Sequence, residues 1–324
     1  MAGVLPLNTG TRPKDLELPG ARAGFRSWLE GEAWRDIIIA TPYVWLILFF
    51  IVPFIIILAM SLAESVIAQP PFKFGDVWPY VTWDNFARLF NDSVYFRGYL
   101  TSLYNAIIAT VLCLFLGYPM ALGIARAKGV MRNVLLLLVI LPFWTSFLLR
   151  VYAWIGLMGS NSWFNKLLTP VVNLFLPAGS HFNSIPMMNT NFAVILVVVY
   201  SYLPFMILPL FANLEKLDFT LNEAAMDLGS KPHQVFRDIT LPLSMPGIIA
   251  GALLVFIPAT GELVIPSLVG NASDPMIGHV INDEFSLNRN WPMASAIAVA
   301  LLLLLVVPIM VYNRIQSKSA QRVK

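Results

Sequence analysis

One carboxylate interrupts the long apolar runs of this sequence. Glu262 stands in the run from about Gly247 to Leu268. The helix around it should be irregular because of Pro258, Gly261 and Pro266. A charge at the centre of a membrane-spanning helix costs about 2.5 to 3.5 kcal/mol on insertion scales, so such a residue usually has a partner or a function. At about 1.5 Å of rise per residue, Glu262 should lie in the outer third of the bilayer.

Two roles for Glu262 fit this position. A carboxylate near aromatic rings suits the passage of a cation, because the face of a ring attracts an ammonium group. The candidate rings are Trp144, Tyr200 and Tyr202. Alternatively, Arg150 lies at a similar depth in another apolar run and could form a buried ion pair with Glu262 that holds two helices together.

The remaining reactive side chains form no catalytic or metal-binding pattern. The three histidines fall in expected loops, and no HExxH pair is present. Cys113 is the only cysteine, so neither an intramolecular disulfide nor a multi-cysteine metal site can form. No GxxxxGK(S/T) phosphate loop occurs, so we expect nucleotide to be bound by another polypeptide. The sequence therefore disfavours an intramembrane enzyme, and we expect no catalytic residue, metal or cofactor.

The composition is that of a membrane protein. Of the 324 residues, 58% are hydrophobic and only 12% are charged, and the mean hydropathy is +0.72. A soluble domain could not bury this much apolar surface. The net charge of +3 does not indicate nucleic acid, because the lysines and arginines form no basic patch interleaved with aromatic residues.

The sequence predicts an all-α integral membrane protein with six transmembrane helices. A helix needs about 20 apolar residues to cross the hydrocarbon core, which is about 30 Å thick. Runs of this length lie at about Ile37–Leu62, Leu100–Ala125, Val134–Met158, Phe192–Leu214, Gly247–Leu268 and Ala294–Tyr312. Each run contains a proline that can kink its helix: Pro53, Pro119, Pro142, Pro204, Pro258 and Pro308.

Positively charged residues set the expected orientation. With the N-terminus inside, fifteen of the 21 lysines and arginines lie in cytoplasmic segments and five in outer loops, so both termini should be cytoplasmic. We expect a tail over 1–36, a first helix with an outer loop over 37–99, a core over 100–314 and a second tail over 315–324. The apolar spacing of Trp163–Leu176 also predicts a short helix on the outer surface.

A polar segment of about 30 residues, 215–243, separates the fourth and fifth apolar runs on the expected cytoplasmic side. Glu223 suits the first turn of a short helix, and Gly229 should end that helix with a left-handed backbone. A second short helix should begin near Pro232 and end at Leu241–Pro242. The apolar side chains available to a partner are Ala224, Ala225, Leu228, Val235 and Phe236.

This segment carries a family signature. Its residues are Glu223, Ala224, Ala225, Gly229, Ile239, Leu241 and Pro242. In type and spacing they resemble the EAA signature of bacterial ABC importer permeases. The resemblance implies the type I importer permease fold, in which a cytoplasmic coupling helix sits in a groove on an ATPase and transmits its closure to the membrane helices.

The resemblance extends from about Pro42 to Val311. Stretches such as LLLLVILPFWTSFLLRVYAWIG and LVFIPATGELVIPSLVG resemble the putrescine and spermidine permeases, specifically the first of their two membrane subunits. This implies a multi-pass protein of the bacterial inner membrane that moves polyamines. It also implies a second related permease chain, two ATP-binding subunits and a periplasmic polyamine-binding protein as partners. Asp283 and Glu284, in an outer loop, are candidates for docking that binding protein.

Two other transport functions stay open at this point. Helices broken by proline also suit a secondary transporter or a channel, although the EAA pattern argues against both. The second alternative is an importer of the same family for iron, thiamine, sulfate or another solute, since the coupling segment does not report the substrate.

Overall fold

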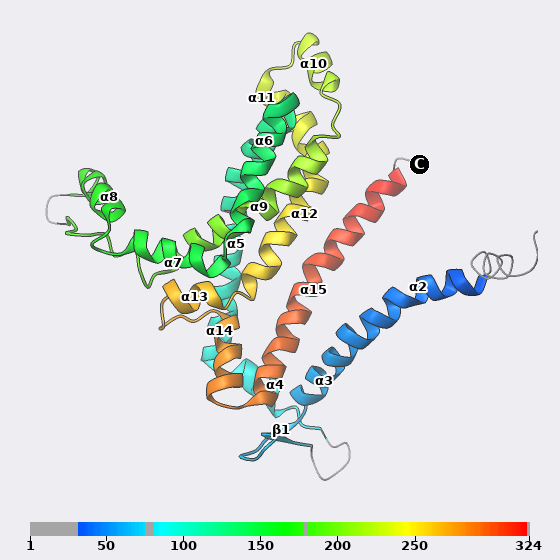
Figure 1. The fold of residues 1–324 in the computed structure, drawn as a ribbon, viewed down its shortest axis with the longest axis vertical. Helices are drawn as coiled ribbons and strands as arrows, with labels where there is room; N and C mark the ends of the chain where they lie inside the picture. Colours follow the sequence, from blue (N-terminus) through cyan, green and yellow to red (C-terminus); the bar gives the residue numbers. More distant parts are fainter. Residues whose placement is uncertain (1–31, 75–80, 178–179, 323–324) are drawn as a thin grey trace, which may run out of the picture. The chain divides into compact units, whose positions relative to one another are not determined.

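The computed structural model describes residues 32–74, 81–177 and 180–322 (Figure 1). Nearly all of the expected tail over 1–36, and the last two residues of the tail over 315–324, lie outside the described residues. The chain divides into two compact units, Met1–Ile56 and Ile57–Lys324.

The described part of the first unit is helical. Helix α2 (Glu32–Leu46) leads into a π-helical turn, η1 (Ile47–Ile51), and α3 (Val52–Ser61) follows. Together, Asp36–Ser61 are long and apolar enough to cross a membrane, which confirms the first predicted span.

Three long helices form the core of the second unit. Helices α5 (Ser93–Arg126), α9 (Asn191–Leu214) and α12 (Leu241–Thr260) pack against one another, and α5 and α9 confirm the second and fourth predicted spans. The buried face of α5 carries small residues three or four positions apart: Ser102, Ala106, Ala109, Cys113, Gly117 and Ala121. Small side chains let membrane helices approach closely, which is how helices associate in lipid.

The third predicted span, Val134–Met158, is not one straight helix. Helix α6 (Gly129–Ile140) ends in a short 3₁₀ turn, η2 (Leu141–Trp144), and α7 (Phe147–Met158) leaves at 91° to it. Pro142 lies at the start of the 3₁₀ turn, and the Thr145 backbone after it is extended. The N–H and the hydroxyl of Thr145 both donate to the Pro142 carbonyl, which holds the bend.

The fifth span also differs from the prediction, because Leu241–Pro242 does not end the preceding helix. Helix α11 (Pro232–Val235) runs through a π-helical turn, η3 (Phe236–Thr240), directly into α12. Proline lacks an N–H and crowds the carbonyl four residues before it. In the π turn the Leu241 N–H donates to the Phe236 carbonyl five residues back, and this wider register lets the helix continue through Pro242.

Short elements surround the end of the core where α5 begins (Figure 1). They are α4 (Asp84–Asn91), the antiparallel strands β1 (Glu64–Ser65) and β2 (Phe72–Lys73), α13 (Val264–Val269), α14 (Ile277–Asn282) and a π turn, η4 (Asp283–Leu287). The buried Ser102 hydroxyl of α5 accepts the Ile277 N–H at 2.7 Å and so fixes the start of α14. The last helix, α15 (Trp291–Arg322), packs on α4 and α14 and continues as a helix into the expected second tail.

Two further helices complete the second unit. Helix α8 (Trp163–Leu174) confirms the short helix predicted over Trp163–Leu176. Helix α10 (Thr220–Asp227) lies next to α11, at the end of the unit opposite α4 and α14 (Figure 1).

By length and composition, four helices among the described residues can each cross a membrane: Asp36–Ser61, Ser93–Arg126, Asn191–Leu214 and Pro232–Thr260. The bent pair α6 and α7 is a fifth if it counts as one span. The apolar part of α15, Trp291–Val307, is shorter. The described residues therefore contain four or five such helices. The six spans that the sequence predicts are reached only if the bent pair and α15 each count as one span.

Close contact between α9 and α12 yields a stability prediction. A Cβ atom added to Gly251 of α12 would lie 2.8 Å from the Met206 Sδ and 3.0 Å from the Met206 carbonyl oxygen. We predict that Gly251→Val lowers the free energy of unfolding in detergent micelles by about 1–3 kcal/mol, the usual cost of overpacking. Gly156→Val on α7 is the matched control, because nothing described lies within 4 Å of a Cβ there. Equal losses in the two variants would contradict the close packing.

Candidate functional site

The segment that carries the EAA pattern forms the predicted pair of short helices. Helix α10 ends at Asp227, and Gly229 adopts the left-handed conformation expected of it, with a φ of 90°. The Ser230 N–H donates to the Ala225 carbonyl at 3.0 Å, and the Gly229 N–H to the Met226 carbonyl at 2.9 Å. These two bonds are the pair that closes a helix on a left-handed residue.

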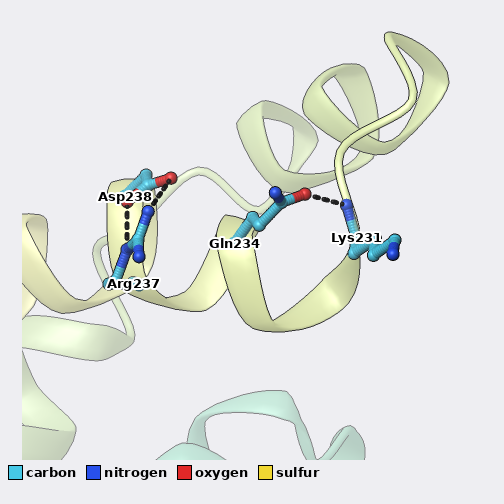
Figure 2. Close-up of polar contacts among 4 residues, drawn as sticks. All are labelled: Lys231, Gln234, Arg237 and Asp238. Atoms are coloured by element: carbon cyan, nitrogen blue, oxygen red, sulfur yellow. Dashed lines mark hydrogen bonds and ion pairs between the residues drawn. The ribbon is translucent and has the colours of Figure 1, made fainter.

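Local polar contacts set the start of each short helix. Before α10, the hydroxyl and the backbone N–H of Thr220 donate to Asp218 and lower the pKa of that carboxyl. An ionised carboxylate is favourable at a helix N-terminus. Figure 2 shows the start of α11, where the Lys231 N–H donates to the Gln234 side chain at 2.8 Å. Further along, the Arg237 guanidinium donates to Asp238 at 2.8 Å, on an exposed face.

Side-chain contacts tie this segment to the helical core. The Asn222 amide of α10 donates to the Thr240 hydroxyl at 3.2 Å, at the end of the π turn. One turn further on, Ser244 of α12 is hydrogen-bonded to the Tyr118 hydroxyl of α5 at 2.9 Å. The Tyr118 ring also packs edge-on against Phe236. Helix α10 is therefore joined through α12 to α5.

A cavity of about 700 Å³ lies between α10 and the loop that joins α5 to α6. Basic residues line it, and two of them lie over aromatic rings: Arg126 is 5.5 Å from the Phe219 ring, and Arg132 is 5.8 Å from the Phe211 ring. Arg132 also pairs with Glu215 at 2.6 Å. These contacts hold the start of the EAA segment against α5 and α6.

The apolar face expected on this segment is partly buried within the chain. Val235 is buried, so it is not available to a partner, because it packs inward where α11 meets the core. Leu228 is 89% exposed, and Leu221 and Met226 beside it are also exposed, although sequence reasoning singled out only Leu228 of the three. Among the signature residues, Glu223, Ala224 and Pro242 are exposed, and Ile239 and Leu241 are half-buried.

Glu262 lies in a break between two helices, as its neighbours predicted. Helix α12 ends at Thr260 and α13 begins at Val264, so Glu262 stands in the turn rather than inside a continuous span. Its side chain is buried, at 8% exposed. The carboxylate accepts the Tyr202 hydroxyl and the N–H groups of Val264 and Ile265, at 3.0 and 3.4 Å. The break thus supplies the donors that a buried carboxylate needs.

Arg150 does not pair with Glu262, so the ion pair considered from the sequence is wrong. The Arg150 Nε and Nη1 atoms are buried without a hydrogen-bond partner among the described residues, and its guanidinium lies 5.8 Å from the Phe147 ring. Counting residues along straight helices gave the two residues a similar depth, but the bend between α6 and α7 turns the helix that carries Arg150.

The structure brings one of the three predicted aromatic residues to Glu262. Tyr202 contacts the carboxylate, whereas Tyr200 packs on Trp154 with ring centroids 5.5 Å apart. Trp144 is 76% exposed at the bend. Sequence reasoning missed Phe205, whose ring lies 5.9 Å from Tyr202 and 5.1 Å from Phe143. The spacing of three residues between Tyr202 and Phe205 on one helix was the signal that could have revealed it.

Asp283 and Glu284 serve contacts within the chain. Asp283 lies 2.9 Å from the His279 Nδ1. Glu284 accepts the Tyr95 hydroxyl and the Asn288 amide, each at 3.1 Å. Both acids are only half-exposed. In the described part of the chain, no three His, Cys, Asp or Glu side chains lie close enough together to hold a metal ion.

Known proteins share both the sequence pattern and the fold. Residues 114–324 match the family described as binding-protein-dependent transport system inner membrane component. The spermidine/putrescine transport system permease protein PotB of Haemophilus influenzae is 39% identical over 284 residues, which cover 86% of this chain and 93% of that protein. The protein of the same name from Escherichia coli is 39% identical over 283 residues, covering 85% and 95%.

A solved structure shares the fold. It is the crystal structure of a bacterial alginate ABC transporter in complex with an alginate pentasaccharide-bound periplasmic protein. One chain of it superposes with a TM-score of 0.64 at 17% identity and covers 92% of this chain and 96% of that one. The likeness concerns the fold alone.

The contacts of Glu262 predict which residues are energetically coupled. In double-mutant cycles, Tyr202→Phe and Glu262→Gln should interact by about 0.5–3 kcal/mol, because the two side chains share a hydrogen bond. Arg150→Gln and Glu262→Gln should add to within about 0.5 kcal/mol, since they share no contact. The measurement is the free energy of unfolding in micelles. Coupling of Arg150 to Glu262 as strong as that of Tyr202 would contradict this arrangement.

Proposed function

The chain belongs to the family of binding-protein-dependent transport system inner membrane components, and on that premise we propose that it forms the translocation path for polyamines in an ATP-driven importer. One observation carries the choice of putrescine or spermidine: 39% identity to spermidine/putrescine permeases over 86% of the chain. A buried carboxylate beside Tyr202 and Phe205 supports it, because ammonium groups are attracted to carboxylates and ring faces.

In this proposal the EAA segment is the coupling element. Helix α10 faces the cytoplasm with Leu228 exposed and enters a groove on an ATP-binding subunit. Closure of the ATPase then moves α10, and the Asn222–Thr240 contact passes that movement to α12. Glu223, Ala224, Ala225 and Gly229 shape α10, whereas Ile239, Leu241 and Pro242 form the passage from the π turn into α12.

The other subunits follow from the same assignment. A second, related permease chain completes the path, two ATP-binding subunits hydrolyse ATP, and a periplasmic binding protein delivers the polyamine. Both termini and α10 lie on the cytoplasmic side, and α4 and α14 lie on the periplasmic side. Asp283 and Glu284 then help dock the binding protein by fixing the shape of the loop after α14 through His279 and Tyr95.

The substrate path passes the break at Glu262. There the carboxylate and the Tyr202 ring meet the ammonium groups as they leave the binding protein. Tyr200 packs on Trp154 of α7, and Trp144 stands at the bend of α6 and α7, where both line the path away from Glu262.

A reconstituted transporter tests this function. Proteoliposomes with all subunits and the binding protein should take up labelled putrescine or spermidine when ATP is supplied. Glu262→Gln should keep basal ATP hydrolysis and assembly and lose uptake by about tenfold or more, as expected for a charge-assisted contact worth at least ~1.5 kcal/mol. Glu64→Gln, which changes an exposed acid in β1, is the control. Uptake of iron, thiamine or sulfate in place of polyamine, or wild-type uptake by Glu262→Gln, would overturn the proposal.

The left-handed Gly229 tests the coupling role. A side chain at this φ adds about 1–2 kcal/mol of backbone strain, so Gly229→Val should lower polyamine-stimulated ATP hydrolysis by about fivefold or more while the complex still assembles. No described atom lies within 4 Å of a Cβ there, so the effect comes from the backbone and not from a clash. Gly229→Asn is the control, because asparagine tolerates this conformation. Normal stimulation in the valine variant, or loss of subunit assembly, would count against the role.

A further inference from the structure

A second polar cavity lies at the end of the core opposite α10. It has a volume of about 150 Å³ and lies between the start of α5, the start of α9 and the chain from α13 to α14. Since about 10–15 Å³ of such space holds one water molecule, the cavity has room for several heavy atoms. The polar side chains that line it are those of Asn105, Asn191, Ser267, Asn271, Asp274, His279 and Asp283.

Asn105 of α5 is the unusual member of this lining. Its side chain is 2% exposed, and neither the amide nitrogen nor the amide oxygen has a hydrogen-bond partner among the described residues. Nearby Ser102, on the same face of α5, does have one in the Ile277 N–H. A buried amide that bonds to nothing in its own protein destabilises the fold, so its place in the cavity wall indicates a ligand.

The charges of the cavity favour a cation. The described residues that line it include Asp274 and Asp283 and neither lysine nor arginine. Asp283 lies against the Nδ1 of His279, and a carboxylate has further lone pairs for other donors. The described chain holds no metal-binding group of three acids, histidines or cysteines, so an organic cation with N–H donors fits better than a metal ion.

The cavity is also connected to the site described above. Helix α14 forms part of its wall, and Gly278 of that helix packs on the turn that holds Glu262. A Cβ at Gly278 would lie 2.6 Å from the Gly261 carbonyl oxygen and 2.7 Å from that of Glu262. The wall of the cavity and the Glu262 turn are therefore in direct contact.

We propose that this cavity binds one primary ammonium group of the transported solute, with the Asn105 Oδ1 atom and the carboxylates of Asp274 and Asp283 as its acceptors. This inference rests on the proposed function, since it assigns an additional binding site for the same polyamine. The cavity receives one end of the polyamine before that end reaches Glu262.

The test is the thermal stability of the purified transporter with putrescine as the probe. Putrescine should raise the Tm, whereas 1,4-butanediol, which has the same length and no charge, should not. Asn105→Leu keeps the volume of the side chain and removes its polar atoms. In this variant, the putrescine concentration needed for the same rise in Tm should increase by about tenfold or more. The Tm without ligand should be unchanged or higher. The comparison is made in a Glu262→Gln background, so that the response does not come from Glu262.

Ser201→Ala is the matched control, because it also removes a buried side-chain oxygen that has no partner among the described residues. Ser201 lies outside the cavity, about 15 Å further along α9 than Asn191, which lines it. It should respond to putrescine as the parent does. Asp274→Asn changes an exposed acid and should weaken the response even if Asn105→Leu fails to assemble. An unchanged response in Asp274→Asn, or in an assembled Asn105→Leu, would overturn the inference, as would an equal response to 1,4-butanediol.

Failure of the proposed function would look different. A wild-type transporter that takes up neither putrescine nor spermidine contradicts that function. Even if such a transporter took up no polyamine, loss of the Tm response to putrescine in Asn105→Leu would support an ammonium site in the cavity.

Discussion

Backbone N–H and C=O groups inside a hydrocarbon layer have to find their partners within the protein. Prolines in apolar helices make this harder, because each removes a donor and crowds a carbonyl. At three of its prolines the backbone changes in one of two ways. Before Pro53 and Pro242 it widens into a π turn, in which the residue ahead of the proline donates five residues back. After Pro142 it bends by 91°, and the Thr145 hydroxyl satisfies the carbonyl that the bend exposes.

Between the π turn and the break at Glu262, α12 is one continuous helix that connects the two sites. One end follows the π turn, where Asn222 contacts Thr240, and the other ends at the break that holds Glu262. Twenty residues at about 1.5 Å each span roughly 30 Å, close to the thickness of a bilayer core. Gly251 and Gly247 lie directly on α9, so α12 cannot shift sideways without moving α9 and the Tyr202 that it carries. This close packing is the physical contact that the proposed coupling of α10 to Glu262 requires.

The sequence predicted the features that depend on local chemistry. The turn at Gly229 followed from the need for a left-handed residue after α10, and the break at Glu262 followed from Pro258, Gly261 and Pro266. The features it missed depend on hydrogen-bond register or on packing between distant residues. By hydropathy, Val134–Met158 forms one apolar run, because hydropathy does not depend on the direction that the helix takes after Pro142.

The same limit explains the wrong partner for Glu262. Counting residues from the helix ends placed Arg150 and Glu262 at the same depth in the bilayer. Equal depth on two helices does not show that the two side chains face each other. Asn105 was missed for a related reason, since an asparagine in an apolar helix becomes informative only when the packing of α5, α9 and α14 is known. Phe205 differs, because its spacing from Tyr202 is visible in the sequence.

The position of Glu262 at a helix break has a chemical reason. Inside a continuous helix the N–H groups of Val264 and Ile265 would be used by carbonyls four residues earlier. Because α13 starts afresh at Val264, these N–H groups can bond to the carboxylate instead. With the Tyr202 hydroxyl they offset much of the cost of burying the acid before any cation arrives. None of the three donors carries a charge, so these contacts place no cation beside the carboxyl group. In the proposed path, an ammonium group therefore gains a charge-assisted contact, and it can leave again because the carboxylate keeps its own hydrogen bonds.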